Sequence, residues 1–597
     1  MTSLGKLEQL IAVPDSAAGA RLTEVASLDV LMTYESGRPA IIGSKVTGRS
    51  WSYSIKGRSL LAIGSLPQQI PTSILNAFEK AQTVDDFDSM SIPGSFALAI
   101  RIGRRIRFQG TISSLRQVHW CRFNGEVVAA TESAVLASLT GLQPDLRALT
   151  RWMITPHAPH PLNTFSAWEG VRTVPPGSYL VTESGRAESI SYWHPIRPDQ
   201  SFEASARGIR ERLAEAIETR VNSPFPLTSD ASGGIDSTIV LSLAAQQRSD
   251  ICAFTTGPSQ LLNDDLRWAA LAIDNAGIKD WIRSEGPDFP EVFSRIDGAL
   301  IRTDEPFAGE ALKMRTHFIA QRLSKDFTGS FITHLTGRLG DELFSSGISH
   351  LRDLKLSRIP EVIDRIGLLH ARTRQSRGSL WGWANSRAPY SVAFQRFLRD
   401  GHMSPGWHTH EIKIPEWINA ASFEQFSDGF DTTVDVSARG ETAEQHETLV
   451  RVSASGELLR HEMAIMANQG VFLEVPLGDD RVLESVFHSP IGSLQDPRTV
   501  KRIFTCAAAG LMPGEIERRT TKVDSTRLIW TGFANHKQAL QRVSTDMLVG
   551  HSALIDEPGF ARSLFGPHPP SLSPMSLWRT LSVEVWLRDL QNMRPVI

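Results

Sequence analysis

The feature that most constrains this chain of 597 residues is the segment Ser-Gly-Gly-Ile-Asp-Ser at positions 232–237. A short apolar and β-branched run precedes it and an apolar-periodic run follows it, which predicts a strand, a tight turn and the start of a helix. Glycines let the backbone curl so that several N–H groups point at one spot, at the positive end of the helix. Hydroxyl groups and one carboxylate accompany them, at Ser232, Ser237, Thr238 and Asp236. The segment therefore predicts a cradle for pyrophosphate, with Asp236 as a ligand of Mg²⁺.

The segment resembles the pyrophosphate loop of ATP pyrophosphatases, which split ATP between the α and β phosphates. No Gly-Lys-Ser/Thr follows the glycines, so the motif does not indicate γ-phosphate transfer. An ordinary Gly-Gly turn before a helix is the alternative. The residues expected to hold the pyrophosphate part of ATP are Ser232, Gly233, Gly234, Asp236, Ser237 and Thr238.

Composition narrows the class of protein. The length is too great for a single core, while 41% hydrophobic and 21% charged residues are typical of a globular protein in water. A net charge of −3 without a basic terminal arm argues against nucleic acid as a partner. The three cysteines lie far apart, which disfavours zinc and disulfides. Because no long apolar run or signal peptide is visible, we expect no membrane association and a cytoplasmic location.

Two domains are expected, at residues 1–200 and 201–597. The first has short alternating runs with turn signals, typical of a β-rich domain, and Pro195–Gln200 has the composition of a linker. In the second, a helical pattern over Ala204–Val221 is followed by strand and helix patterns in alternation. Alternation of this kind predicts an α/β fold with a doubly wound parallel sheet, whose ligands bind at the carboxyl ends of the strands.

A second polar segment follows a predicted strand at 331–335. It reads Thr-Gly-Arg-Leu-Gly-Asp-Glu and spans residues 336–342. Because Asp236 and Asp341 both follow strands of the same predicted sheet, we expect them to form a Mg²⁺ pair at its carboxyl edge. A solvated turn is the alternative interpretation of Gly340-Asp341-Glu342 taken alone.

The order of several further strings resembles the asparagine synthetase superfamily over nearly the full chain. They are Pro93–Ala97, Ser113–Trp120, Ala130–Ser133 and Val174–Gly177 in the first domain, and Glu474–Asp479, Leu511–Lys522 and Leu577–Arg588 in the second. The resemblance implies an N-terminal, Ntn-hydrolase-like glutaminase domain followed by a synthetase domain of the ATP-pyrophosphatase type. It also implies ATP and Mg²⁺ as the cofactors.

Two departures from that superfamily change the expected chemistry. Glutamine-hydrolysing members have a nucleophilic cysteine after the initiator Met, whereas this sequence reads Met1-Thr2-Ser3. We therefore expect a degenerate glutaminase domain and an amine from another source. Arg338 stands where asparagine synthetases have a glutamate, so a cation replaces an acid beside the reacting carboxylate and amine.

The length, the Thr-Gly-x-x-Gly-Asp-Glu string and the Arg-Thr-Thr-Lys string at 519–522 look most like lasso-peptide macrolactam synthetases. That resemblance implies a leader-free peptide whose Asp or Glu side chain is adenylated and then attacked by the N-terminal amine. It implies a leader peptidase and a precursor-recognition protein as partners. A β-lactam synthetase or an ammonia-dependent asparagine synthetase is the alternative enzyme. A silent scaffold that binds a peptide or protease is the non-enzyme alternative, and a tRNA-modifying enzyme is disfavoured by the acidic balance.

The resemblance also implies roles for individual residues. Thr255, Thr256 and Gly257, at the end of the next predicted strand, are expected to face adenine and ribose, and Gly337 to allow close approach of the nucleotide. Lys522 is expected to neutralise the α-phosphate or the developing oxyanion. Glu342 and Glu462 are the candidate bases for the attacking amine, and a solvated or structural role is the alternative for each.

Overall fold

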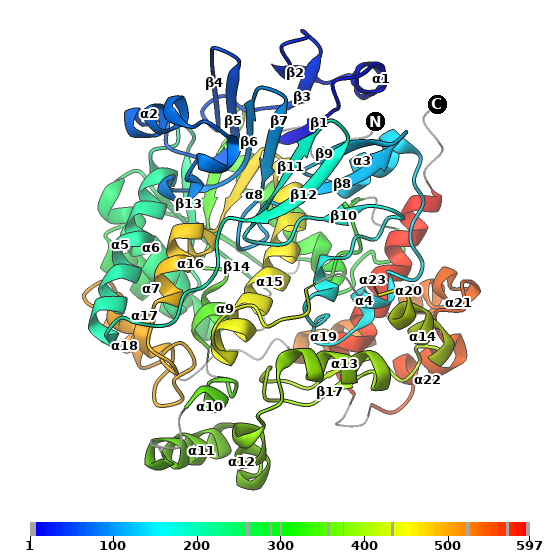
Figure 1. The fold of residues 1–597 in the computed structure, drawn as a ribbon. Coiled ribbons are helices and arrows are strands. Elements are labelled where there is room, and N and C mark those ends of the chain that lie inside the picture. The colour runs from blue at the N-terminus through cyan, green and yellow to red at the C-terminus, as the bar shows by residue number, and fades with distance from the viewer. Residues whose placement is uncertain are drawn as a thin grey trace.

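The computed structural model describes residues 8–257, 262–286, 289–298, 301–345, 347–354, 359–373, 375–430, 435–519, 526–568 and 572–592. Figure 1 shows its two parts: antiparallel sheets from the first third of the chain lie above a parallel sheet that is surrounded by helices. The predicted α/β fold class is thus confirmed.

Two six-stranded antiparallel sheets form the N-terminal part. One has the order β10-β8-β9-β1-β3-β2, with bounds Arg172–Thr173, His119–Phe123, Glu126–Ala130, Gln9–Ala12, Pro39–Ser44 and Asp29–Thr33. The other has the order β12-β11-β7-β6-β5-β4, with bounds Arg186–Ser191, Ser178–Glu183, Arg105–Gln109, Ser95–Ile102, Arg58–Ser65 and Ser50–Ile55. Alternation of apolar residues in these strands gives each sheet a buried face.

Apolar side chains of both sheets, including Leu10, Ile41, Leu61 and Phe108, form one core between them. Helices cover the outer faces: α1 (Ala17–Ala26) and α3 (Ser133–Thr140) pack on the first sheet, and α2 (Thr72–Lys80) packs on the second. The resulting helix–sheet–sheet–helix layers agree with the expected Ntn-hydrolase-like domain. Helix α4 (Thr150–Met153) follows α3.

The second part is built on a five-stranded parallel sheet of order β15-β14-β13-β16-β19. The strands are Asp280–Glu285, Cys252–Gly257, Leu227–Asp230, Ile332–Leu335 and Val471–Glu474. From β13 the chain adds β14 and β15 on one side, then returns to add β16 and β19 on the other. The strand order therefore reverses between β13 and β16, which is where doubly wound sheets bind ligands.

Helices cover this sheet on both faces. Helix α6 packs on β13 and on its neighbours α5 and α7, whereas α8 and α15 pack on β19 and on each other. Their bounds are Phe202–Val221 (α5), Ile235–Gln247 (α6), Leu262–Ala276 (α7), Lys313–Asp326 (α8) and Ala443–Ala467 (α15). The predicted helices and strands in this region are confirmed with shifts of one or two residues at their ends.

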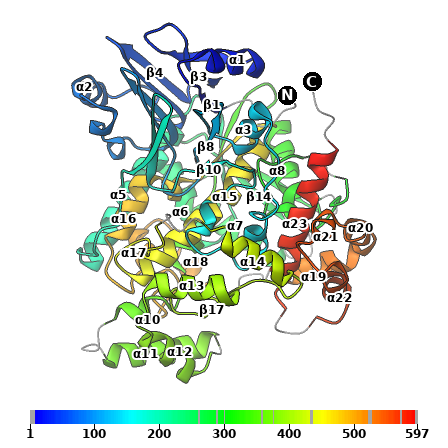
Figure 2. The ribbon, with the colours of Figure 1, turned by 45° about the vertical axis from the view of Figure 1, so that its right-hand side comes forward.

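The remaining helices extend below and beside the sheet (Figures 1 and 2). They are α9 (Gly340–Phe344), α10 (His350–Asp353), α11 (Ile359–Thr373), α12 (Arg377–Asn385), α13 (Tyr390–Asp400), α14 (Ala420–Asp428), α16 (Asp480–Phe487), α17 (Arg502–Ala507), α18 (Gly514–Glu517), α19 (Thr526–Asn535), α20 (Lys537–Val543), α21 (Leu548–His551), α22 (Glu557–Phe565) and α23 (Pro574–Gln591). A two-stranded sheet joins β17 (His402–Met403) to β18 (Ile412–Lys413). Across the described ranges, none of the helices is both long and apolar enough to cross a bilayer.

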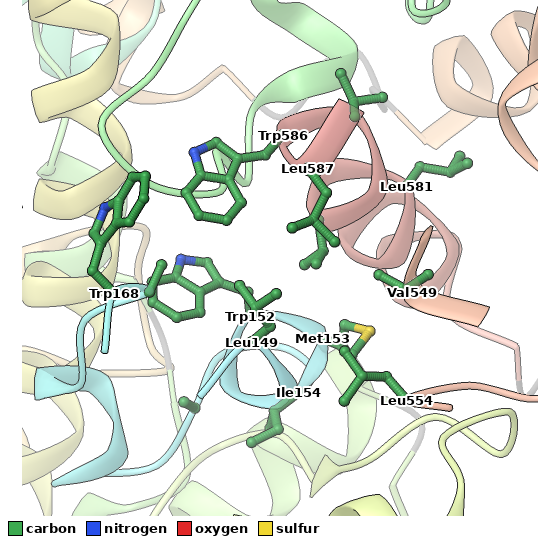
Figure 3. Packing of buried hydrophobic residues seen from close by; sticks show 14 of the residues in the cluster. Leu149, Trp152, Met153, Ile154, Trp168, Val549, Leu554, Leu581, Trp586 and Leu587 are labelled. Carbon is green, nitrogen blue, oxygen red and sulfur yellow. The ribbon is translucent and has the colours of Figure 1, made fainter. Parts of the chain in front are cut away.

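A hydrophobic cluster joins the two ends of the chain. Figure 3 shows α4 of the N-terminal part against α21 and α23, with Trp152 and Trp168 facing Trp586. The rings of Trp168 and Trp586 meet edge to face with centroids 5.3 Å apart. Aromatic pairs of this geometry add to the burial energy of the side chains. The N-terminal sheets are therefore fixed to the C-terminal helices by a common core.

Candidate active site

The loop between β13 and α6 forms the predicted cradle. Gly233 has φ +66°, a conformation that glycine adopts without strain, and a Cβ on it would lie 2.3 Å from the Cβ of Trp268. The Ser232 and Ser237 hydroxyl oxygens are 2.8 Å apart, and the N–H of Gly234 lies 3.4 Å from the Ser232 hydroxyl. Backbone N–H groups and hydroxyls thus gather at the N-terminus of a 13-residue helix.

Two glycines bring the second polar segment directly against this loop. A Cβ on Gly337 would lie 2.5 Å from the backbone nitrogen of Ser237, and a Cβ on Gly340 would lie 2.3 Å from Cγ of Asp236. No side chain fits in either position, so the requirement for glycine in Thr-Gly-x-x-Gly-Asp-Glu is steric. The approach places the loop after β16 beside the loop after β13, as the switch-point topology requires.

Asp236 and Asp341 are brought together, as the sequence predicts, and Lys501 joins them. The Lys501 ammonium contacts Oδ2 of Asp236 and lies 2.8 Å from Oδ1 of Asp341. Asp341 is 52% exposed and Asp236 is 18% exposed. Sequence reasoning missed Lys501, because it belongs to no local motif and meets Asp236 across 265 positions of sequence.

The two carboxylates fit a Mg²⁺ ion. Mg²⁺ prefers hard oxygen ligands and usually keeps waters and phosphate oxygens beside one or two carboxylates. Among the described residues, no group of three or more His, Cys, Asp and Glu side chains is arranged to hold a metal ion. A pair of carboxylates beside the glycine turn therefore fits a metal that takes its other ligands from water or phosphate, and the Lys501 ammonium is the neighbouring positive charge.

The three threonines expected to bind ATP have side chains that are buried or engaged within the protein. The Thr238 side chain is completely buried, so it supports the loop from beneath. Thr255 is also buried, and its hydroxyl donates to the carbonyl of Ala231 (2.6 Å) and accepts from the indole N–H of Trp281 (2.9 Å). Thr256 donates to the carbonyl of Ser284 (3.0 Å). The threonine hydroxyls of β14 are thus engaged within the sheet, and the roles of Thr255, Thr256 and Gly257 at adenine and ribose stay predictions.

Arg338 and Glu462 form an ion pair beside the loop. The guanidinium of Arg338 lies 3.4 Å from Oε2 of Glu462, with exposed fractions of 49% and 10%. Burial raises the pKa of Glu462, and Arg338 opposes that rise. In turn, the Glu462 carboxylate raises the pKa of Arg338. Glu462 is therefore a carboxylate whose environment favours proton uptake, as a general base requires.

Glu342, two residues before the end of α9, is the other candidate base. Its carboxylate accepts a hydrogen bond from the Ser455 hydroxyl at 2.7 Å, and the Asp341 carbonyl accepts one from Arg451 at 2.6 Å. Because Ser455, Arg451 and Glu462 all belong to α15, that one helix positions both candidate bases. Roles for Glu342 and Glu462 in proton transfer remain predictions.

Lys522 lies outside the described residues, as do its neighbours from 520 to 525. Arg519 is described, and it donates to the Gly233 carbonyl at 3.1 Å and pairs with Asp265. The segment that leads to Lys522 is therefore attached to the glycine turn itself.

A cavity of about 90 Å³ lies between the two parts of the chain, lined by residues that include Arg49, Glu132, Asp304 and His461. None of the three cysteines lines it. Burial raises the pKa of both Cys121 and Cys252 to about 11, so both are protonated at neutral pH. The guanidinium of Arg49 is held by Glu8 and by Glu474 (2.6 Å), so it is not available to a ligand.

Comparison of the sequence with known families agrees with this site. The family model described as asparagine synthase matches residues 208–588, more than half of the chain. The chain belongs to the asparagine synthase family. The matched range contains the glycine turn, Asp341, Glu462, Lys501 and Lys522, and thus the whole candidate site of this family member.

Curated relatives cover smaller parts. Asparagine synthetase [glutamine-hydrolyzing] 1 of Bacillus subtilis is 24% identical over 271 residues, 44% of this chain and 41% of that protein. Amidase chyE of Penicillium rubens is 32% identical over 142 residues, 22% of this chain and 20% of that protein. The matched part of the chain thus spans well under half the length of these relatives. A solved glutamine PRPP amidotransferase from B. subtilis aligns with 12% identity over 57% of this chain and 82% of its own, and its TM-score of 0.21 is too low to support an argument.

Proposed function

We propose that this member of the asparagine synthase family is an ATP-dependent carbon–nitrogen ligase that closes a macrolactam in a peptide, as in lasso-peptide biosynthesis. The observation that carries the ligase chemistry is the meeting of the Ser232–Ser237 turn, Asp236, Asp341 and Lys501 at the switch point of the sheet. The carboxylate to be activated is an Asp or Glu side chain of the peptide, and the amine is its N-terminus.

The first step adenylates the substrate. A carboxylate oxygen forms a bond to the α-phosphorus of ATP as the bond to the β-phosphate oxygen breaks, and pyrophosphate leaves. The N–H groups and hydroxyls of the turn stabilise the leaving pyrophosphate. Asp236 and Asp341 would hold Mg²⁺, which when bound neutralises phosphate charge. The Lys501 ammonium supplies a further positive charge at the same edge.

The second step forms the amide. The peptide ammonium loses one proton, and the resulting amine attacks the acyl carbon. As the C–N bond forms, AMP leaves with the bond electrons and the nitrogen loses a second proton to solvent. We assign uptake of the first proton to Glu462, because burial raises its pKa and its carboxylate pairs with Arg338 of the loop after β16. The products are one amide, AMP and pyrophosphate, with a net loss of one water from the peptide.

The proposal takes the amine from the peptide and not from glutamine, and two features of the N-terminal part support this choice. Glutamine hydrolysis in this superfamily requires a thiol nucleophile, and no cysteine of this sequence lines the cavity between the two parts. Arg49 at the same cavity is closed off by two carboxylates. These observations support a ligase that does not draw ammonia from glutamine.

The test is incubation of the full chain with ATP, Mg²⁺ and synthetic peptides that have a free N-terminal glycine and one Asp or Glu at successive positions. The proposal expects AMP, pyrophosphate and a peptide lighter by one water that resists aminopeptidase. A parallel reaction contains aspartate and ammonium in place of peptide. AMP and asparagine in that reaction, with no cyclic peptide in the first, would establish an asparagine synthetase instead.

A further inference from the structure

The guanidinium group of Arg338 is only loosely engaged. Its distances to Glu462 are 3.4 Å (Nη1 to Oε2) and 3.5 Å (Nη2 to Oε1), whereas strong charge-assisted hydrogen bonds are about 2.7–2.9 Å long. A guanidinium has about five N–H donors in a planar fork. With 49% of the side chain exposed, donors remain for a further acceptor on the open side.

The backbone fixes the place of this cation. On one side, Gly337 touches the glycine turn, since a Cβ there would lie 2.5 Å from the Ser237 nitrogen. On the other side, Leu339 has φ +75° and a side chain that is 1% exposed. A bulky residue in the left-handed region is strained and persists only where its surroundings hold it. Arg338 is therefore held between the cradle and the core, and its side chain is the part that reaches solvent.

The other carboxylates near Arg338 have partners of their own. Asp230, the last residue of β13, lies 3.1 Å from Nε2 of His334, and Glu342 accepts from Ser455 at 2.7 Å. Within the described ranges, Glu462 is the one acidic side chain within 4.0 Å of the guanidinium. The fork is thus partly free, next to the position where a phosphate group is expected.

We propose that Arg338 binds the substrate carboxylate that is to be adenylated. This inference rests on the proposed function and names the group that the site recognises, a carboxylic acid in its ionised form. A guanidinium fork matches both oxygens of a carboxylate, and its charge offsets the repulsion between that anion and the phosphates. Arg338 makes no covalent bond, and it fixes which oxygen faces the α-phosphorus.

The test measures binding without turnover. Two peptides are compared, one with Asp as acceptor and one with Asn, in the presence of Mg²⁺ and α,β-methylene-ATP, which cannot be cleaved between the α and β phosphates. For the unmodified protein, titration calorimetry should give a Kd lower by about tenfold or more for the Asp peptide. In Arg338→Met the ratio of the two Kd values should fall to about one, with the Kd of the nucleotide unchanged.

Arg399→Met is the matched control, because Arg399 is also an exposed arginine paired with one carboxylate, Asp400 at 2.7 Å, and lies on α13. It should leave the ratio unchanged. Arg338→Lys keeps the charge but loses the fork, so it should give an intermediate ratio. If Arg338→Met does not fold, the ratio of the two Kd values in Arg338→Lys tests the inference in its place.

The outcomes separate this inference from the proposed function. If the unmodified protein binds both peptides equally, or binds neither, or if Arg338→Met keeps the full ratio, the inference is wrong. AMP formation by the unmodified protein together with an unchanged ratio in Arg338→Met would overturn this inference alone. No AMP from any Asp or Glu peptide, together with a ratio that depends on Arg338, would overturn the proposed ligase and leave the carboxylate site in place.

Discussion

Among the charged residues at the carboxyl edge of the parallel sheet two, Arg338 and Asp341, are about half exposed, whereas the charged residues between the two parts of the chain are all at most 9% exposed. We call the first group the edge cluster; it consists of Asp236, Arg338, Asp341, Glu462 and Lys501. We call the second the interface network; it consists of Glu8, Arg49, Arg220, Glu474 and Asp479.

In the interface network every charge has close partners. Glu474 is 1% exposed and lies 2.6 Å from Arg49 and 2.8 Å from Arg220, and these cations hold its pKa at about 2 although burial raises it. In the edge cluster, the Arg338–Glu462 distance is 3.4 Å and Asp341 is half-exposed. Closed charges stabilise one arrangement, and half-open charges are free to exchange their partners for those of a ligand. Position in the fold, and not residue type, separates the two groups.

The largest effect is expected from removing the metal pair of the edge cluster. Asp236→Asn combined with Asp341→Asn should lower the rate of AMP formation by about 10³-fold or more, because the leaving pyrophosphate loses its counter-ion. The melting temperature should also fall, because the buried Lys501 loses both carboxylate partners, so the rate is compared per folded molecule. As a control, Asp400→Asn removes an exposed carboxylate paired with Arg399 on α13. Unchanged AMP formation in the double variant would remove the edge cluster from the reaction.

The second-largest effect is expected on stability, from a change in the interface network. Glu474→Gln keeps the shape of the side chain but leaves Arg49 and Arg220 with one carboxylate each, and should lower the free energy of unfolding by about 3–5 kcal/mol. Urea unfolding, from the midpoint and slope of the transition, measures this change in the free energy of unfolding. AMP formation per folded molecule should be retained.

The comparison for that variant is Asp250→Asn, which breaks the pair between Asp250 and Arg248. Asp250 is 69% exposed, so the expected change is about 0–1 kcal/mol. Equal shifts in the two variants would show that the interface network is no more stabilising than a surface ion pair.

A smaller effect on the whole reaction is expected for Glu462→Gln. Loss of a general base should slow amide formation by about a hundredfold. Adenylation should continue, so hydroxylamine, which needs no general base of this kind, should still trap the activated acid as a hydroxamate. Should hydroxamate formation fall as far as cyclisation, Glu462 acts before the amine and is not its base.

The sequence alone located much of the edge cluster. Asp236, Gly337 and Asp341 lie within short motifs, so their spacing is visible without a structure, although the contact that requires glycine at 337, with Ser237, spans about a hundred positions. Lys501 was missed because its contact with Asp236 depends on how α17 packs across 265 positions. The strands were predicted because alternation is local. The interface network was not predicted, since Arg49 and Glu474 belong to different parts and meet only in the folded chain.

Asp480 can be compared directly with Glu474. Its carboxylate also joins the two parts of the chain, but its pKa lies near neutral pH. Its carboxylate accepts from the Ile112 N–H (2.9 Å) and the Tyr192 hydroxyl (2.7 Å), and burial raises its pKa to about 7. A folded-state pKa above the unfolded value of about 3.9 means that the folded protein holds the proton more tightly. The resulting stability is fully present below pH 4 or so and is lost as pH rises through about 7.

Asp480→Asn mimics the protonated form and should remove this dependence. The variant should be more stable than the unmodified protein at pH 8 by up to about 4 kcal/mol, since each of the roughly three units between the two pKa values is worth about 1.4 kcal/mol. The difference should shrink steadily as pH falls below 7 and approach zero only below about pH 4. Urea unfolding followed at several pH values between these limits measures it. Glu474→Gln should show no such convergence above pH 5, because the pKa of Glu474 is about 2 and its charge is constant there. A constant difference for Asp480→Asn would mean that Asp480 is ionised in the fold and belongs with the closed charges of the interface network.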